Sequence, residues 1–145
     1  MTNEELIKLA IEAREKAYAP YSHWKVGAAL LTKEGKVYKG CNIENSGFTA
    51  TNCAERTAFF KAISEGEYNF AKIAIVGGDE KLGLTDICTP CGVCRQVMSE
   101  FCHPDEFRVI CAKDENTYED YSLREMLPNC RFVSEDDGYG FKGTK

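Results

Sequence analysis

The run KIAIVGG at residues 72–78 is the feature that most constrains the fold of this chain. It is short and almost entirely apolar, which is typical of a strand buried on both faces of a sheet. A β-hairpin is expected before it, with strands at Val26–Leu31 and Val37–Cys41. FRVICAK at 107–113 is expected to be a further strand, followed by a short fifth one at Tyr118–Tyr121. With helices between and after these strands, the order of elements predicts a layered α/β fold with a mixed sheet.

Sequence signals also mark the ends of four helices. Thr2 and Glu5 form a capping box at the start of the first helix, whose apolar stripe continues to Ala17 and which is expected to stop before Pro20. The other three helices are expected from about Cys53 to Ser64, from about Cys91 to Cys102, and from a Ser122–Glu125 capping box to Pro128.

The length and charge of the chain argue against several classes of protein. Its 145 residues are expected to form a single domain over 1–145, of which about 136–145 is a flexible C-terminal tail. The first residues lack the apolar core of a signal peptide and no apolar run is long enough to cross a bilayer, so we expect a cytoplasmic protein without a membrane partner. The 18 basic and 23 acidic residues give a net charge of −5 without a basic cluster, which disfavours nucleic acid as a ligand.

Eight cysteines raise the possibility of a disulfide framework. The chain is longer than secreted disulfide scaffolds, has no export signal and has enough apolar residues for a core. We therefore expect reduced thiols that bind metal or pack in the core. Those at 41, 102, 111 and 130 are expected to be small buried apolar groups.

Three other cysteines have the spacing of a metal site. Cys91 and Cys94 lie three residues apart on one face of a helix start, and Cys53 begins another helix. If the two helices lie side by side with their N-termini level, the three thiols converge, and the helix N-termini favour thiolates. Three protein ligands leave the fourth position of a tetrahedral zinc open to water, which is the sign of a catalytic site, and Glu55 is expected beside that position.

The charge of such a site requires positive neighbours. The net charge of zinc and three thiolates is −1. This negative charge opposes the task of a catalytic zinc, which is to lower the pKa of its bound water. Arg56 and Arg95 follow the first residues of the two ligand helices. Both are candidates to donate hydrogen bonds to the sulfurs and so withdraw negative charge.

These residues resemble the zinc-dependent cytidine deaminases, in particular the small homotetrameric type. Cys53-Ala-Glu55 followed by Pro90-Cys91-x-x-Cys94 resembles the deaminase signature, with Cys at the first ligand position where many members have His. The segments YAPYSHWKVGAALLTKEGKVYKGCNIEN, TNCAERTAFFKA and PCGVCRQVMSE extend the resemblance from about Thr2 to Glu135. It implies a three-layer α/β fold, with a mixed five-stranded sheet and helices packed on both faces.

The resemblance also implies a reaction and a set of site residues. The reaction is hydrolytic deamination of cytidine, and of deoxycytidine, to the uridine product and ammonia in pyrimidine salvage. One Zn²⁺ per subunit is implied, and Glu55 carries a proton from water to N3 and a second one to the departing amine. The resemblance further implies that Asn42 and Glu44 hydrogen-bond the ribose, and that Trp24 and Phe48 form walls of the pocket. Backbone groups near Ala54 and Pro90 would contact the base, and Arg56 would donate a hydrogen bond to a ligand sulfur. Phe132 would reach into the pocket of a neighbouring subunit.

Some positions depart from the family pattern or favour another hypothesis. Trp24 stands where Phe is usual, Val93 stands where Ala is usual, and the loop from Gly77 to Thr89 is a few residues longer. Cys88 together with the other three thiols predicts, as an alternative, a closed structural zinc site on a binding module. Two further alternatives are deamination of another aminopyrimidine compound, such as a blasticidin-type antibiotic, and deamination of a base in nucleic acid.

Overall fold

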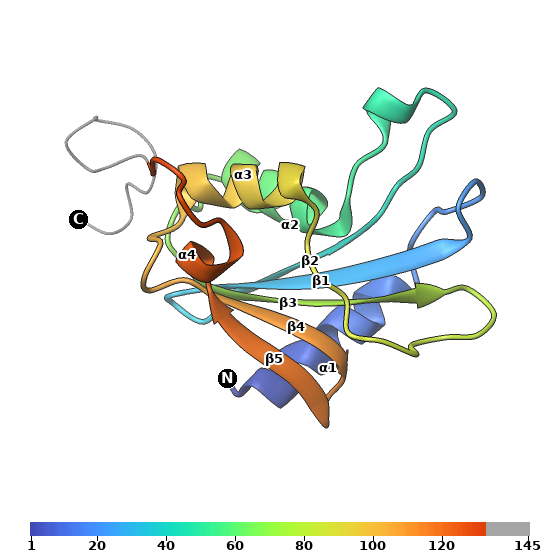
Figure 1. The fold of residues 1–145 in the computed structure, drawn as a ribbon, viewed down its shortest axis with the longest axis horizontal. Helices are drawn as coiled ribbons and strands as arrows, with labels where there is room; N and C mark the ends of the chain where they lie inside the picture. Colours follow the sequence, from blue (N-terminus) through green and yellow to red (C-terminus); the bar gives the residue numbers. More distant parts are fainter. Residues whose placement is uncertain (133–145) are drawn as a thin grey trace.

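A five-stranded sheet forms the middle of the fold (Figure 1). The computed structural model describes residues 1–132, so the predicted flexible tail at 136–145 lies outside the described residues. The strand order is β2-β1-β3-β4-β5, in which β3 and β4 pair in parallel and the other neighbours pair antiparallel, as a mixed sheet requires. The strands are β1 (Trp24–Thr32), β2 (Val37–Cys41), β3 (Phe70–Asp79), β4 (Arg108–Asp114) and β5 (Thr117–Ser122).

Helices cover both faces of this sheet (Figure 1). One face carries α1 (Asn3–Arg14), and the other carries α2 (Ala54–Ser64), α3 (Gly92–Phe101) and the short α4 (Leu123–Met126). The three-layer fold implied by the resemblance is therefore confirmed. Among residues 1–132, no helix has the length and apolar character that crossing a bilayer requires.

β3 is the central strand and is buried on both faces, as its sequence predicts. Ile73 and Ile75 pack into the core beneath α2 and α3, whereas Ala74 and Val76 pack into the core beneath α1, all with 0% exposure. A shift of β3 by one residue would place each set of side chains on the opposite face of the sheet. Their burial therefore fixes the register of β3 against its neighbours.

Both predicted capping boxes are present. The Thr2 side chain accepts a hydrogen bond from the backbone N–H of Glu5, and Ser122 accepts one from that of Glu125; each glutamate in turn accepts the backbone N–H of its cap residue. These bonds satisfy backbone donors that a helix start otherwise leaves free.

α1 stops at Arg14, before Pro20 as predicted but three residues short of Ala17, to which its apolar stripe was expected to continue. The buried Arg14 guanidinium donates hydrogen bonds of 3.0, 2.9 and 2.9 Å to the carbonyl oxygens of Lys25, Gly78 and Asp79. These contacts hold the end of α1 against β1 and β3, and the chain then turns away. α4 likewise ends at Met126, two residues earlier than predicted.

A glycine lets α2 lie directly on β2. A Cβ atom at Gly40 would stand 2.4 Å from the carbonyl oxygen of Ala54 and 2.6 Å from the backbone nitrogen of Ala58. No side chain fits between these two backbones. Gly40 thus sets how closely the N-terminus of α2 approaches the sheet.

Candidate metal centre and active site

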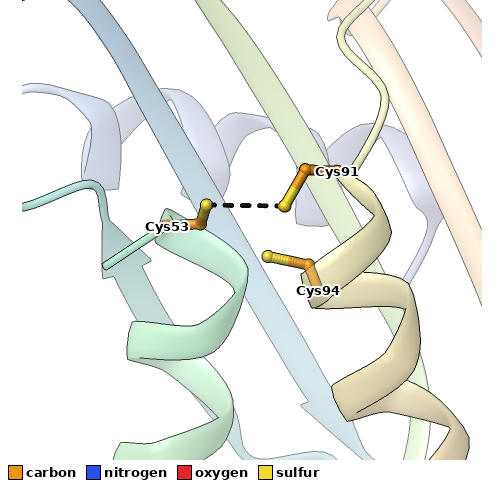
Figure 2. Close-up of side chains that lie close together, drawn as sticks. All are labelled: Cys53, Cys91 and Cys94. Atoms are coloured by element: carbon orange, nitrogen blue, oxygen red, sulfur yellow. Dashed lines mark hydrogen bonds between the residues drawn. The ribbon is translucent and has the colours of Figure 1, made fainter. Parts of the chain in front are cut away.

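Three thiols meet where α2 and α3 begin, and Figure 2 shows them pointing toward one another between the two helices. Cys53 is the N-cap residue of α2, Cys91 is the N-cap residue of α3, and Cys94 lies in the first turn of α3. The Sγ atoms of Cys53 and Cys91 are 3.7 Å apart, and all three sulfurs lie within 4.8 Å of one another. All eight cysteines of the chain are free thiols. The three side chains converge as their spacing predicts.

The distances between the sulfurs fit a tetrahedral zinc ion. Zinc–thiolate bonds of about 2.3 Å at tetrahedral angles place two sulfurs about 3.8 Å apart. The 3.7 Å between Cys53 and Cys91 agrees with this value. Three thiolates leave one coordination position for a ligand that the protein does not supply.

Charge around the sulfurs favours the thiolate form of Cys53. A hydrogen bond from Cys94 and the nearby guanidinium of Arg56 lower the pKa of Cys53 to about 5. The Arg56 Nη2 atom donates to Cys53 Sγ at 3.2 Å. The pKa of Cys94 is raised because this thiol donates to Cys53 and is buried. Arg56 therefore has the contact expected of it, and a metal ion would replace the proton that the two thiols share.

Glu55 is buried in the first turn of α2, with 4% exposure. Burial raises the pKa of its carboxyl group to about 7; a backbone hydrogen bond opposes this shift, and the negative charge of Cys53 adds to it. A carboxyl group with a pKa near the working pH both accepts and releases protons readily.

A cavity of about 330 Å³ lies in front of the thiols. It brings together most of the side chains that sequence analysis selects, namely Trp24, Asn42, Glu44, Cys53, Ala54, Glu55 and Cys91. Its volume lies within the range of small-molecule sites, which is roughly 300–1,000 Å³. One cavity thus joins two of the three candidate metal ligands, a proton carrier and groups suited to hydroxyl recognition.

Asn42 and Glu44 line this cavity and are held by β1 and the loop before it. Asn42 is buried; its Oδ1 accepts from the N–H of Val26 and its Nδ2 donates to the carbonyl oxygen of Trp24, both at 2.8 Å. Glu44 Oε1 accepts from the backbone N–H groups of Tyr21 and Ser22 at 3.0 and 3.1 Å. Partial burial opposes ionisation of Glu44, but these bonds and the Ser22 hydroxyl keep the pKa of its carboxyl group below the usual value.

The family model of the cytidine and deoxycytidylate deaminase zinc-binding region matches residues 1–111 of this chain. The chain belongs to this deaminase family. A cytidine deaminase of Sporosarcina psychrophila is 45% identical over 139 residues, which cover 96% of this chain and 97% of that protein. A crystal structure of cytidine deaminase from Burkholderia pseudomallei is similar with a TM-score of 0.82 and 45% identity, over 90% of this chain and 100% of that one. A blasticidin-S deaminase of Bacillus cereus is 35% identical over 109 residues, 73% of this chain and 76% of that protein.

Two aromatic residues of this deaminase lie outside the cavity of their own chain. Phe48 belongs to a short 3-10 helix (Phe48–Ala50) on the loop that projects beyond β2 in Figure 1, and its side chain is 91% exposed. Within one chain Phe48 lines two neighbouring hollows, one shared with Glu44 and the other with Cys53 and Cys91, so its role as a pocket wall stays a prediction. Phe132 packs over Arg124, with the guanidinium carbon 5.6 Å from the ring centre. Its contact with a neighbouring subunit stays a prediction.

The prediction for Arg95 is wrong. Its Nε atom donates to the carbonyl oxygen of Pro90 at 2.9 Å and its Nη1 atom to that of Met126 at 2.8 Å. No hydrogen bond links it to a sulfur within residues 1–132. The position of Arg95 after Cys94 turns it toward α4 and away from the thiols, so it supports the loop that leads into α3.

Cys88 does not complete a four-thiolate site in this deaminase. It lines the cavity but is not part of the cluster of three sulfurs within 4.8 Å. Burial raises the pKa of its thiol to about 12, so it stays neutral and packs as an apolar group. The closed structural zinc site is therefore not formed.

Sequence reasoning missed several residues that line the cavity. They are Ser22, Val26, Thr51, Asn52 and Thr89. The strand period alone could have indicated Val26, because it follows Trp24 by two positions and points to the same face of the sheet. The others lie on loops, where no such period exists.

Proposed function

We propose that this protein catalyses the zinc-dependent hydrolytic deamination of cytidine, and of deoxycytidine, to the uridine product and ammonia. One observation carries the proposal: a buried carboxyl group, that of Glu55, lines the same cavity as Cys53 and Cys91, two members of a cluster of three thiols with zinc spacing. The 45% identity to a cytidine deaminase over nearly the whole chain supports this substrate class.

The residues of the chain divide the work of the reaction. Cys53, Cys91 and Cys94 would hold zinc, which supplies a Lewis acid that lowers the pKa of water. Glu55 would accept one proton of the attacking water and deliver it to N3 of the base. It would then take the second proton of that water from the hydroxyl group added at C4 and pass it to the amine, which leaves as ammonia. General acid–base transfer of this kind contributes roughly 10²–10⁴ in rate. The raised pKa of Glu55 suits a group that must accept and release a proton in each cycle.

Positioning of the nucleoside falls to the rest of the cavity. Asn42 and Glu44 keep unused hydrogen-bonding capacity, which suits ribose hydroxyls. The indole of Trp24 offers an apolar wall for the base. Backbone groups at Ala54 and Pro90 lie near the metal ligands and are proposed to bind the polar edge of the base.

We further propose a homotetramer with shared active sites. Beside the metal centre lies a second hollow of about 510 Å³, lined in part by Phe48, Arg56, Cys91 and Val93. Phe48 is 91% and Val93 57% exposed, and burial of these side chains against another subunit would remove apolar surface from water. Phe132 is proposed to reach the pocket of a neighbouring subunit. Light scattering of the protein in solution tests the assembly, and a fully active monomer would refute it.

Pyrimidine salvage in the cytoplasm is the setting proposed for this reaction, with a free nucleoside as the substrate and neither nucleic acid nor a membrane as a partner. The support is the acidic net charge of −5 and the small volume of the cavity.

A second candidate is deamination of a blasticidin-type aminopyrimidine, which the 35% identity to a blasticidin-S deaminase favours. Cytidine and blasticidin S compared at equal concentrations distinguish the two functions. Faster turnover of blasticidin S would replace the first proposal.

The decisive experiment follows the ultraviolet absorbance of cytidine with the parent protein and with Glu55→Gln. The amide preserves the shape of the carboxyl group but cannot carry the proton, so we expect zinc to stay bound and the rate to fall by at least ~10²–10⁴. A chelator should abolish the activity of the parent protein. Activity of the variant within tenfold of the parent, with zinc bound in both, would remove Glu55 from the mechanism.

A further inference from the structure

Three side chains of the cavity wall converge on one glycine of β3. Gly77 lies directly opposite Val26 of β1, and Trp24 precedes Val26 by two residues on the same face of that strand. Cys88 reaches the same point from the loop before α3. Trp24, Val26 and Cys88 all line the cavity that holds Glu55.

No room remains for a side chain at Gly77. A Cβ atom there would stand 2.9 Å from Cys88 Sγ, 3.1 Å from Val26 Cγ2 and 3.2 Å from Trp24 Nε1. Ordinary contacts between such atoms are about 3.5–4.0 Å, so at least one of the three groups would have to move.

The surroundings determine which groups can move. Val26 is β-branched and therefore stiff about its first torsion, and Asn42 holds the backbone of β1 through the N–H of Val26 and the carbonyl oxygen of Trp24. The Trp24 indole and the Cys88 thiol are the groups that can rotate. The open space beside both is the cavity, so their displacement would narrow it.

The chemistry of this wall selects one edge of the base. In the proposed reaction, C4 and N3 of the pyrimidine face the metal centre and Glu55, and the sugar lies at Asn42. Trp24, Val26 and Cys88 present mainly carbon and sulfur. The C5–C6 edge of cytosine bears only hydrogen, so it is the part of the base that such a wall accommodates without leaving a polar atom unpaired.

We propose that Gly77 is a specificity-determining residue: its lack of a side chain lets Trp24 and Cys88 close against β3 and sets the width of the cavity at the C5–C6 edge of the pyrimidine. This inference rests on the proposed function. Gly77 touches no reacting atom and acts through Trp24 and Cys88. Its substitution should therefore change KM and the relative kcat/KM of different pyrimidine nucleosides, and should change kcat less.

The test compares cytidine with 5-methylcytidine in the parent, Gly77→Ala, Trp24→Phe and the double variant. One methylene group in an apolar pocket changes discrimination by roughly 10–200-fold. We expect Gly77→Ala to raise KM for cytidine by about tenfold or more and to weaken use of 5-methylcytidine further. In the Trp24→Phe background, Gly77→Ala should raise KM by a smaller factor, because phenylalanine lacks the Nε1 atom that stands 3.2 Å from the added methyl group. If Gly77→Ala raises KM by the same factor in the parent and in Trp24→Phe, the inference is overturned.

Trp24 is the only tryptophan of the chain, so the fluorescence emission of the protein reports the surroundings of its indole. This measurement does not require an active enzyme. Displacement of the indole into the cavity by Gly77→Ala should shift its emission to longer wavelength. An unchanged emission together with unchanged KM values would overturn the inference. If the parent protein does not deaminate cytidine, the proposed function fails, while the emission still decides whether Gly77 positions Trp24.

Cys88→Ala provides a second variant in case Gly77→Ala does not fold. It removes the atom nearest to the added methyl group and widens the same wall. We expect it to raise kcat/KM for 5-methylcytidine relative to cytidine. A fall in this ratio would contradict the assignment of the wall to the C5–C6 edge.

Discussion

The guanidinium of Arg56 donates a hydrogen bond to the Sγ atom of Cys53 at 3.2 Å, from one helical turn further along α2. The bond places a permanent positive charge beside a cluster in which zinc and three thiolates would sum to −1. It withdraws electron density from the sulfur and holds the Cys53 side chain in its ligand orientation. The helix N-termini behind Cys53 and Cys91 act in the same direction.

We expect Arg56→Gln to weaken zinc binding or turnover by about 10–100-fold, because groups that support a metal ligand typically have effects of this size. Competition with a chromogenic chelator measures the affinity. Arg108→Gln is the matched control: Arg108 pairs with Asp120 on the surface, and exposed ion pairs are worth ~0–1 kcal/mol. If both variants bind zinc equally well and deaminate cytidine at the same rate, the Arg56 bond has no role in the metal centre.

Replacement of Cys91 by Ala should release the metal and lower the melting temperature. Cys91 is exposed, so its removal costs little packing, and a loss of stability reports the lost link between α2 and α3. Cys41→Ala serves as the control because this half-buried thiol lies outside the sulfur cluster. Metal analysis and thermal unfolding of both variants provide the measurement. Full zinc occupancy of Cys91→Ala would assign the ligands elsewhere.

The parts of the site that sequence reasoning predicted correctly are those fixed by local geometry. Cys53 and Cys91 are N-cap residues, and Cys94 follows three positions later, so helix geometry places each sulfur at the N-terminus of its helix. The packing of α2 beside α3 then brings the three sulfurs together (Figure 2). The strand KIAIVGG was equally predictable, since burial on both faces requires an uninterrupted apolar run.

The predictions that were wrong depend on tertiary contacts that no local pattern contains. Arg95 and Arg56 occupy similar places after a ligand cysteine, yet Arg95 turns to the carbonyl oxygens of Pro90 and Met126 because α4 lies beside α3. The length of α1 was overestimated because the contacts of Arg14 with β1 and β3 end the helix.

Gly40→Ala should disturb the site by displacing the N-terminus of α2 from β2. The added methyl group would meet the backbone of Ala54 and Ala58, which cannot rotate away, so α2 must shift and carry Cys53 and Glu55 with it. We expect a destabilisation of about 1–3 kcal/mol. A displacement of about 1 Å at reacting groups costs ~10² in rate.

Lys39→Ala is the control for Gly40→Ala, because Lys39 is the neighbouring residue on β2 with an exposed side chain. Chemical denaturation and kcat provide the two readouts. A Gly40→Ala protein with the stability and rate of the control would show that the close approach of α2 to β2 does not position the site.

The sugar requirement of the reaction tests the roles of Asn42 and Glu44 in the cavity. Glu44 accepts two backbone N–H groups and the Ser22 hydroxyl, and a carboxylate offers about four acceptor positions, so capacity remains for a ribose hydroxyl. Asn42 likewise keeps one N–H and one lone pair. Free cytosine would leave these groups unpaired, and sites of this kind reject the analogue that lacks the hydroxyl by up to ~10⁴–10⁵.

Cytidine within a nucleic-acid strand should fail for a different reason. A sugar hydroxyl bound by Glu44 cannot also form a phosphodiester, and the ionised carboxylate repels the phosphate. We therefore expect turnover of cytidine but not of cytosine or of a cytosine-containing oligonucleotide at equal concentration, with Glu44→Gln reducing the preference for cytidine over cytosine. Comparable rates on cytosine would remove Asn42 and Glu44 from sugar recognition, whereas comparable rates on the oligonucleotide would make nucleic acid the substrate.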